Sequence, residues 1–238
     1  MGGRGGGALS LLGLAGAALA AAGDVLLLGR GCSGADFDQA TGMVPPGLEA
    51  DARWRSLWNG AAFSERRARL GTVTGLVGIV SVGVGLAGPA GAGTGRFPIP
   101  VSLRRVTTVS AGIFTVCGAV THWSCAAAVS QARSAWSGEG RGPTSGSGAV
   151  RLFAAGAAGT LAALAVLSGA QAAAARERGA GVLALATPFP FVLVALLTFG
   201  RLPAPLGGFL RPASISSGLL AHFAVTALPP GAAPEGEA

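Results

Sequence analysis

The chain has 238 residues, of which 50% are hydrophobic and only 11% are charged, and its mean hydropathy is +0.58. Soluble globular domains carry about 25% charged residues, so this composition excludes an ordinary water-soluble domain. The apolar residues occur in blocks of about twenty, the length that a helix needs to cross the hydrocarbon layer of a bilayer. We therefore predict an all-α fold, a polytopic transmembrane helix bundle with about six spans.

The charge balance is basic, with 17 arginines, no lysine and 10 acidic residues. The absence of lysine excludes Schiff-base cofactors and a phosphate-binding lysine. The arginines lie mostly at the ends of apolar blocks, where such residues contact lipid headgroups, and they form no stripe that a nucleic acid could follow. We predict no cofactor and no nucleic acid; the expected partners are membrane lipids and either another membrane protein or a second copy of the chain.

The first apolar block covers residues 8–29. A helix of that length rises about 33 Å, which is enough for a hydrocarbon layer of about 30 Å. A cleaved signal peptide is the alternative, because the small residues 20–22 would permit cleavage. However, the apolar run resumes at Val25 and the leading segment carries only Arg4, so we favour a retained first helix.

Residues 30–69 form the largest polar segment of the chain. Pro46 can open a short helix there, and Trp54 and Trp58 would lie on neighbouring turns of it. This pattern is typical of a helix at the membrane interface. A solvated loop with two incidental tryptophans explains the same residues.

Five further spans follow, separated by a flexible Gly/Ser-rich loop at 134–149 and ended by a disordered tail at 230–238. The expected spans are residues 70–91, 106–131, 150–175, 180–200 and 206–228. Pro188 and Pro190 should kink the fifth helix. With six spans, the odd-numbered connections carry eleven arginines against six on the side of the termini, so the positive-inside rule favours both termini outside the cytoplasm.

Ionisable residues inside these spans are Asp24, His122 and His222. An ionisable group costs about 2.5–3.5 kcal/mol in the middle of a span and is therefore a functional candidate. Asp24 lies five residues, and His122 nine, from the ends of two helices that run in the same direction, so both fall in the same half of the bilayer. We predict that Asp24 and His122 form a buried polar pair, directly or through water, and that His222 lies in the other half.

Such a pair could relay protons or bind a cation, because imidazole titrates near neutral pH; a structural hydrogen bond between helices is the alternative. His122 and Cys125 form an H-x-x-C pattern, half of a zinc or copper site. A site needs further ligands, so we predict no bound metal and keep Cys125 and His222 as secondary candidates. No G-x-S-x-G or H-E-x-x-H motif occurs, and we favour a protein that is not an enzyme.

Several glycines have the spacing that lets helices approach closely. They are Gly71 and Gly75, Gly83, Gly85 and Gly88, and Gly156 and Gly159. Residues 83–88 also match G-x-G-x-x-G, but they lie inside an apolar span with no βαβ unit around them, which excludes a nucleotide fingerprint.

Four short segments together resemble a known family: Gly23-Asp24, residues 69–71, residues 118–122 and residues 202–208. They are similar to a bacterial group of six-span membrane proteins known only as a domain of unknown function. The resemblance covers nearly the whole chain. It implies a six-helix bundle with Asp24 and His122 as characteristic polar positions, and it implies no activity. Where that family tends to have a polar residue in the last helix, this chain offers Ser214, Ser216 and Ser217.

Two functions fit the sequence. The first is transport or sensing of a small solute, an ion or a proton through the site at Asp24 and His122. The second is a non-catalytic membrane scaffold or assembly factor that binds another membrane protein through Gly/Ala-rich faces. A cavity that reaches the pair would favour the first function, and a dry bundle with an exposed face of small residues would favour the second.

Overall fold

The computed structural model describes residues 3–41, 65–88, 101–136, 148–177 and 186–227, and within these ranges all regular secondary structure is helical. The four long helices are α1 (Gly3–Leu28), α4 (Glu65–Ala87), α5 (Val101–Trp136) and α6 (Gly148–Arg176). The shorter ones are α2 (Gly34–Thr41), α7 (Pro188–Phe199), α8 (Leu206–Leu210) and α9 (Ser214–Ala227). The predicted all-α class is thus confirmed for the described part of the chain.

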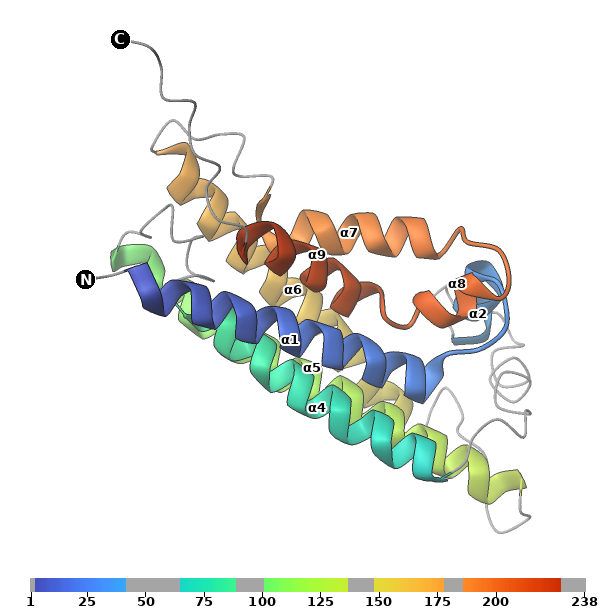
Figure 1. Cartoon of the computed structure of the whole chain (residues 1–238). Helices are drawn as coiled ribbons and strands as arrows, with labels where there is room; N and C mark the ends of the chain where they lie inside the picture. The colour runs from blue at the N-terminus through green and yellow to red at the C-terminus, as the bar shows by residue number, and fades with distance from the viewer. Residues whose placement is uncertain (1–2, 42–64, 89–100, 137–147, 178–185, 228–238) are drawn as a thin grey trace.

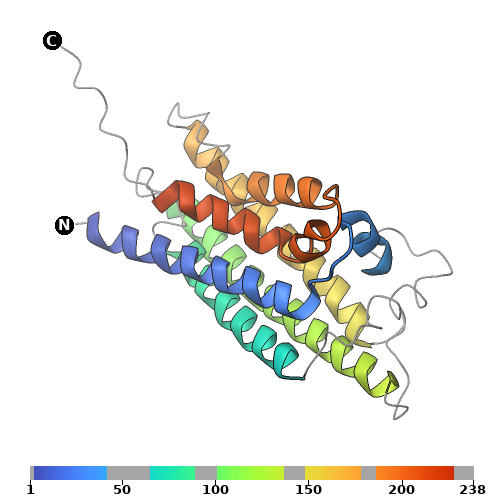
Figure 2. The same cartoon turned by 45° about the vertical axis from the view of Figure 1, so that its right-hand side comes forward.

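The long helices and the two apolar short ones form a bundle (Figures 1 and 2). Contacts run in a closed circuit, from α1 to α4, α5, α6, α7 and α9 and back to α1. The start of α1 and the end of α9 lie at the same end of the bundle (Figure 1). The apolar core occupies the middle of this circuit and includes Leu86, Phe114, Leu164 and Phe223.

Four segments are long and apolar enough to cross a membrane. They are Ala8–Leu28, Glu65–Ala87, Leu103–Ser130 and Gly148–Arg176, with hydropathies of 2.0, 1.9, 1.4 and 1.8 over their most apolar windows. Helices α7 and α9 are apolar but have only 12 and 14 residues, which corresponds to about 18 and 21 Å against a layer of about 30 Å. The fold is therefore that of a helical membrane protein with four full-length candidate spans.

The last two expected spans differ most from the observed helices. Pro188 and Pro190 do not kink a helix over 180–200, because they lie in the first turn of α7, where Thr187 is the N-cap. Proline is well tolerated there, since the first turn has no intrahelical partner for its missing N–H. The expected span 206–228 is also interrupted, because α8 ends at Leu210 and α9 begins at Ser214.

The first helical pair, α1 and α4, packs antiparallel through small residues. A Cβ added to Gly23 would lie 2.6 Å from the Cα of Gly75, and one added to Gly78 would lie 2.4 Å from the backbone nitrogen of Ala20. The contact positions recur at steps of three, four or seven residues: Gly13, Gly16, Ala20 and Gly23 on α1, and Gly71, Gly75, Gly78 and Gly85 on α4. The backbones approach closely because these positions carry almost no side chain, as is common where dispersion drives helix association in lipid.

Glycines also set the contact between α5 and α6. A Cβ on Gly156 would lie 2.5 Å from Oγ1 of Thr121, and one on Gly159 would lie 2.6 Å from Sγ of Cys117. The expectation that both groups of glycines serve helix packing is confirmed. Branched side chains point the other way and cover the outside of α4 and α5: Val73, Val77, Val80 and Val84, and Val109, Ile113 and Val116.

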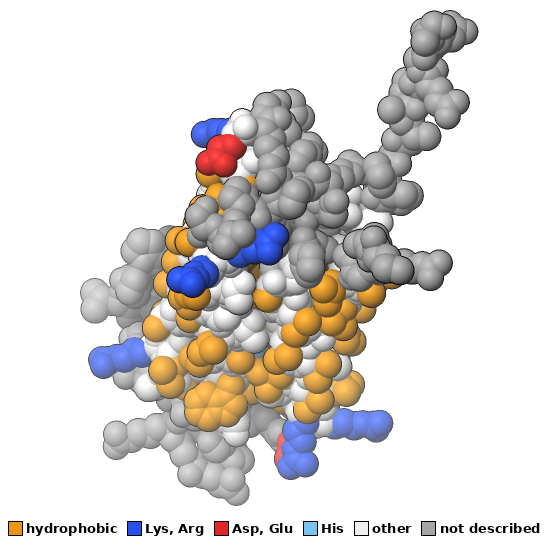
Figure 3. Space-filling model, turned by 90° about the vertical axis from the view of Figure 1, so that its left-hand side faces the viewer, with side chains coloured by type: hydrophobic (Ala, Val, Ile, Leu, Met, Phe, Trp, Pro, Cys, Tyr) orange, Lys and Arg blue, Asp and Glu red, His pale blue; other side chains and the backbone are white. Residues whose placement is uncertain are grey.

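The outer surface of the described residues is largely apolar. Figure 3 shows hydrophobic side chains over the middle of one face and the charged side chains around them. Apolar surface of this kind is stable against lipid, and arginines around it suit the headgroup region.

A compact cap covers the end of the bundle at which α1 ends, and it consists of α2, α8 and the connections beside them (Figure 2). Backbone hydrogen bonds join these connections: Arg30 N–H to Gly208 O (3.0 Å), Gly208 N–H to Cys32 O (2.7 Å) and Gly34 N–H to Leu202 O (2.9 Å). We call this unit the α2–α8 cap. Glycine is required in it, because a Cβ on Gly34 would lie 2.1 Å from the carbonyl oxygen of Phe199.

Arginine side chains connect the cap and the end of α1 to neighbouring helices. Arg211 Nε contacts Oδ1 of Asp38 at 2.6 Å, and its NH1 donates to the carbonyl of Leu196 at 3.0 Å. Arg67 donates to the carbonyls of Val25 and Gly29 at 3.0 and 3.1 Å, which satisfies acceptors at the end of α1. The described part of the polar segment 30–69 is thus partly helical and contacts the bundle. The interfacial helix expected after Pro46 lies outside the described residues. Residues 137–147 of the expected loop and the tail lie outside them as well.

A buried Asp–His–Ser site between α1, α5 and α9

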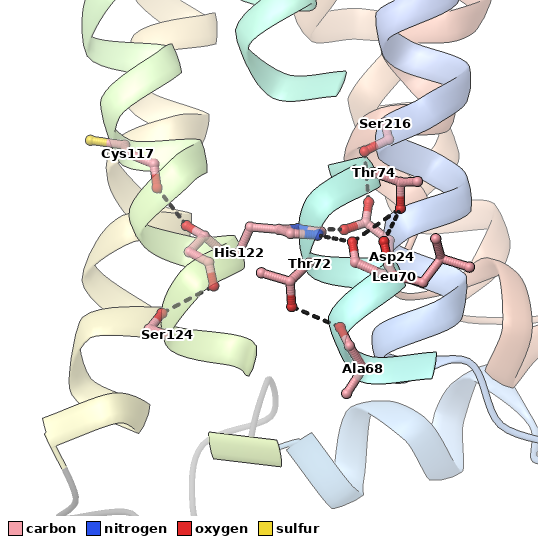
Figure 4. A network of polar contacts seen from close by, with 11 residues as sticks. Asp24, Ala68, Leu70, Thr72, Thr74, Cys117, His122, Ser124 and Ser216 are labelled. Atoms are coloured by element: carbon pink, nitrogen blue, oxygen red, sulfur yellow. Dashed lines mark hydrogen bonds and ion pairs between the residues drawn. The ribbon is translucent and has the colours of Figure 1, made fainter. Parts of the chain in front are cut away.

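Asp24, His122 and Ser216 meet in the interior of the bundle, one from each of α1, α5 and α9 (Figure 4). Nδ1 of His122 lies 3.3 Å from Oδ1 of Asp24, and the hydroxyl of Ser216 donates to Oδ2 of Asp24 at 2.7 Å. The contact expected between Asp24 and His122 is therefore direct. His122 is 4% exposed and Asp24 19%, so the pair lies away from the lipid-facing surface.

The second nitrogen of His122 fixes the tautomer of the ring. Nε2 lies 3.0 Å from the carbonyl oxygen of Gly71 on α4. A carbonyl oxygen can only accept a hydrogen bond, so Nε2 carries a proton. Nδ1 of a neutral ring would then be an acceptor that faces a carboxylate, which is also an acceptor.

One additional proton resolves this conflict. It can lie on Nδ1, which gives an imidazolium and a carboxylate, or on Oδ1 of Asp24, which gives a neutral acid and a neutral ring. In both forms the hydroxyl of Ser216 donates to Oδ2, so the extra proton belongs between His122 and Asp24. With this geometry, a hydrogen bond between Nδ1 of His122 and Oδ1 of Asp24 requires one proton between the two helices.

The imidazole fits because α4 presents glycine to it. A Cβ added to Gly75 would lie 1.7 Å from Nε2 of His122 and 2.2 Å from Cε1. Gly75 is therefore a direct requirement for the position of the ring. The same surface of α4 supplies the carbonyl of Gly71, so one small-residue segment both makes room for the ring and orients it.

A cavity of about 100 Å³ adjoins the pair, and five helices contribute to its wall. Asp24, Thr121, His122, Thr160 and Ser216 are its polar lining residues. The remainder of the wall is apolar and includes Leu27, Ile79, Phe114, Phe153 and Leu219. A cavity of this kind, mostly apolar with a few convergent polar groups, is the usual form of a small-molecule site.

Cys125 also lines the cavity and is buried. It lies one helical turn after His122, as the H-x-x-C pattern requires. Among the described residues, no three His, Cys, Asp or Glu side chains are grouped closely enough to hold a metal ion. Cys125 is thus part of the cavity wall.

His222 lies elsewhere in the bundle. Its Nδ1 is 2.8 Å from the carbonyl of Ala186, and its ring packs against those of Phe191 and Phe223. His222 follows Ser216 by six residues on α9, which is about 9 Å along the helix. The structure therefore does not bring His222 to the pair, in line with its expected position at a different depth.

Ser216 and Gly71 complete the site, but sequence reasoning did not assign either of them to it. The sequence indicates Ser216 only as one of three neighbouring serines in the last helix. Nothing in the sequence distinguishes it from Ser217, since only the facing of α9 decides which hydroxyl reaches Asp24. Gly71 contributes its backbone carbonyl, which every residue has, so the residue type does not indicate this role.

No protein-family model, curated protein or solved structure matches this chain. The fold and the site are those of a helical membrane protein with a buried polar site. The resemblance to an uncharacterised six-span family stays a prediction.

Proposed function

We propose that this chain is a multi-pass integral membrane protein that binds and releases a proton at Asp24 and His122 while it transports or senses a small solute or ion. The observation that carries the proposal is the cavity that adjoins the pair. A purely structural hydrogen bond between helices would be packed on all sides, whereas this pair forms part of the wall of an open space.

The proton arrangement supports the same function. The pair needs one proton to satisfy both of its facing atoms, and loss of that proton would leave two acceptors opposed at 3.3 Å. Protonation and local geometry are therefore coupled. This coupling is what a proton-driven conformational step requires.

We further propose that α7 and α9 act as the fifth and sixth spans. Both are apolar along their length, and both contact the long helices within the same circuit. Six crossings would leave both termini on one side, which fits the common position of the start of α1 and the end of α9. Single-cysteine accessibility at residues 3 and 227 in oriented vesicles tests this: labelling from opposite sides would exclude an even number of spans.

Proton movement can be measured in proteoliposomes that contain a pH-sensitive dye and carry an imposed membrane potential. We expect Asp24→Asn to lose pH-dependent flux, because asparagine can still hydrogen-bond to the imidazole but cannot exchange the proton. His122→Gln should lose it too, while the amide can still donate to the Gly71 carbonyl. Ser217→Ala is the matched control, since Ser217 is adjacent to the site residue on α9 and has no hydrogen bond to Asp24.

Normal flux in both Asp24→Asn and His122→Gln, at normal expression and folding, would exclude the pair from proton transfer. If the proteoliposomes show no flux, a sensing role predicts instead that wild-type fluorescence changes with pH and that the Asp24→Asn variant does not respond. Identical pH responses of the two proteins would exclude the sensing role as well.

A second candidate, the scaffold, is favoured by the outer face of α6. Small exposed residues recur there every three or four positions, namely Ala155, Ala158, Ala162, Ala165 and Gly169, and the larger Leu152 and Val166 are exposed on the same helix. Such a face allows close approach of another transmembrane helix. Ala162→Ile should abolish co-purification of a partner membrane protein if this function holds, and retention of the partner would reject this face as the interface.

A further inference from the structure

The polar groups on the wall of the cavity beside the pair offer hydrogen-bond acceptors, and we propose that the cavity binds a small organic ammonium ion. The ligand would be a primary amine with a short hydrocarbon body, and its ammonium group would take the place of the proton held by Asp24 and His122. This inference rests on the proposed function, because it names the solute class and assigns the proton of the same site as its exchange partner.

The size of the cavity sets the size of the ligand. It has a volume of about 100 Å³, somewhat less than an engineered cavity of about 150 Å³ that holds benzene. In proportion to the six carbon atoms of benzene, a ligand of about four to five non-hydrogen atoms fits this space. The apolar wall, with Ile79, Phe114, Phe153 and Leu219, suits a hydrocarbon body rather than a cluster of waters, because a buried water needs two to four polar partners.

The polar groups on the wall have already used their donors. The hydroxyl of Thr121 donates to the carbonyl of Cys117 at 2.8 Å, and that of Thr160 donates to the carbonyl of Gly156 at 2.8 Å. Ser216 donates to Asp24 at 2.7 Å. What these three hydroxyls still offer is acceptor lone pairs.

Asp24 and His122 offer acceptors as well. A carboxylate has about four lone-pair sites, and His122 and Ser216 occupy only two of those on Asp24. Nε2 of His122 is engaged with Gly71, so Nδ1 becomes an acceptor once the shared proton leaves. A group that supplies several N–H donors matches this wall, whereas a carboxylate or phosphate would find no N–H or O–H donor.

The charge on the wall points the same way. Its titratable residues are Asp24 on α1 and His122 and Cys125 on α5, and α4, α6 and α9 contribute none to it. Arg67 and Arg30 lie near the end of α1, where each donates to backbone carbonyls, and neither lines the cavity. When a primary ammonium ion enters, it contacts the carboxylate of Asp24, the shared proton leaves as H⁺ and His122 becomes neutral, so the total charge of the site is unchanged.

Three four-carbon probes distinguish this ligand class, namely n-butylammonium, n-butanol and butyrate. Their binding to the full chain in mild detergent can be followed by thermal unfolding. We expect n-butylammonium to raise Tm progressively with its concentration, by about 3–6 °C at ten times its Kd, with a smaller rise for n-butanol and none for butyrate. An alkylamine stays protonated at pH 6–8, as lysine does with its pKa of about 10.4. Because binding releases the shared proton, the Kd of the amine should fall by up to tenfold for each unit that the pH rises, over the pH range in which the free pair is protonated.

Two alanines on α6 supply a matched pair of variants. Ala157 lines the cavity, and Ala154, three residues before it, is exposed. Ala157→Leu should fill the cavity and abolish the effect of n-butylammonium on Tm, and Ala154→Leu should preserve it. Asp24→Asn should weaken n-butylammonium at least tenfold and remove the pH dependence of its Kd, while affecting n-butanol less.

The failure of this inference is separable from that of the proposed function. Equal Tm shifts for butyrate and n-butylammonium, or an n-butylammonium shift that survives in Ala157→Leu, would overturn the ammonium site. So would n-butanol binding as tightly as the amine. Proton flux or a pH response that depends on Asp24 and His122 without any amine present would leave the proposed function in place in each of these cases.

Discussion

The contact between Gly75 and His122 gives the sharpest test of the site. In Gly75→Ala the new Cβ would lie 1.7 Å from Nε2 of His122. Ordinary contact begins near 3.4 Å, so the ring or the helix has to move by about 1.7 Å, the difference between 3.4 and 1.7 Å. Because Nε2 is 3.0 Å from Gly71 O and Nδ1 is 3.3 Å from Asp24, a shift of that size breaks or strains both polar contacts.

The expected cost follows from these losses. A hydrogen bond to a charged group contributes about 1.5–3 kcal/mol and a neutral one about 0.5–1.5 kcal/mol, and alanine recovers about 0.5–1 kcal/mol of helix propensity over glycine. We expect Gly75→Ala to lower the free energy of unfolding by about 1–4 kcal/mol. Tryptophan fluorescence during titration with sodium dodecyl sulfate in mixed micelles measures this quantity.

Two control glycine variants and a His122→Ala background test whether this cost arises from the contact with His122. Gly112→Ala and Gly169→Ala place a Cβ with nothing within 4 Å and should leave stability unchanged or slightly higher. In a His122→Ala background the clash is gone, so Gly75→Ala should cost almost nothing and the double-mutant cycle should show coupling of about 1 kcal/mol or more. A Gly75→Ala variant as stable as Gly112→Ala, or a cost that persists without the imidazole, would refute the assigned role of Gly75.

Further predictions concern the α2–α8 cap. Arg211→Gln should speed amide hydrogen exchange across α2 by about tenfold or more, because α2 loses a partly buried ion pair; unchanged exchange would show that the ion pair does not hold the helix. Gly34→Ala, whose Cβ would lie 2.1 Å from the carbonyl oxygen of Phe199, should cost about 2 kcal/mol or more, while Gly31→Ala has open space; equal stability in thermal unfolding would contradict the tight cap. Burial first, and then Asp36, raise the pKa of the Cys32 thiol, so thiolate is scarce at neutral pH and alkylation should accelerate as pH rises. Asp36→Asn should lower that pKa and speed alkylation at pH 7.5, measured in a chain whose other two cysteines are serine; a slower reaction would reverse the assigned sign.

The long helices were predictable because their signal is simple. Residues 8–28, 70–87, 106–130 and 150–175 are predominantly apolar, and each segment is long enough to cross the bilayer as a helix that satisfies its own backbone hydrogen bonds. The contact of Asp24 with His122 was also within reach, because counting residues from the ends of two parallel-running helices gives their depths. Depth alone says nothing about facing, and only the packed bundle shows that both side chains point inward.

The last third of the chain was harder to predict. Hydropathy gave one segment at 206–228, but Arg211 and Pro212 separate α8 from α9, and the partner that favours this break is Asp38, 173 residues away. The cavity was not predictable either, since its wall draws on several helices and depends on the small volumes of Gly118 and Ala157. Long-range pairing of this kind is invisible to any local window of sequence.

The site has a consequence for biosynthesis. Asp24 and His122 are separated by 98 residues, the difference between 122 and 24, and a ribosome adds about 5–20 residues per second. The carboxyl group is therefore synthesised about 5–20 seconds before its imidazole, and the serine on α9 is synthesised later still. The first helix has to carry this acid alone, at a cost of about 2.5–3.5 kcal/mol, and its hydropathy of 2.0 over the most apolar window is what allows insertion before the partner exists. Assembly of the proton-holding pair is for this reason a late event in the maturation of the protein.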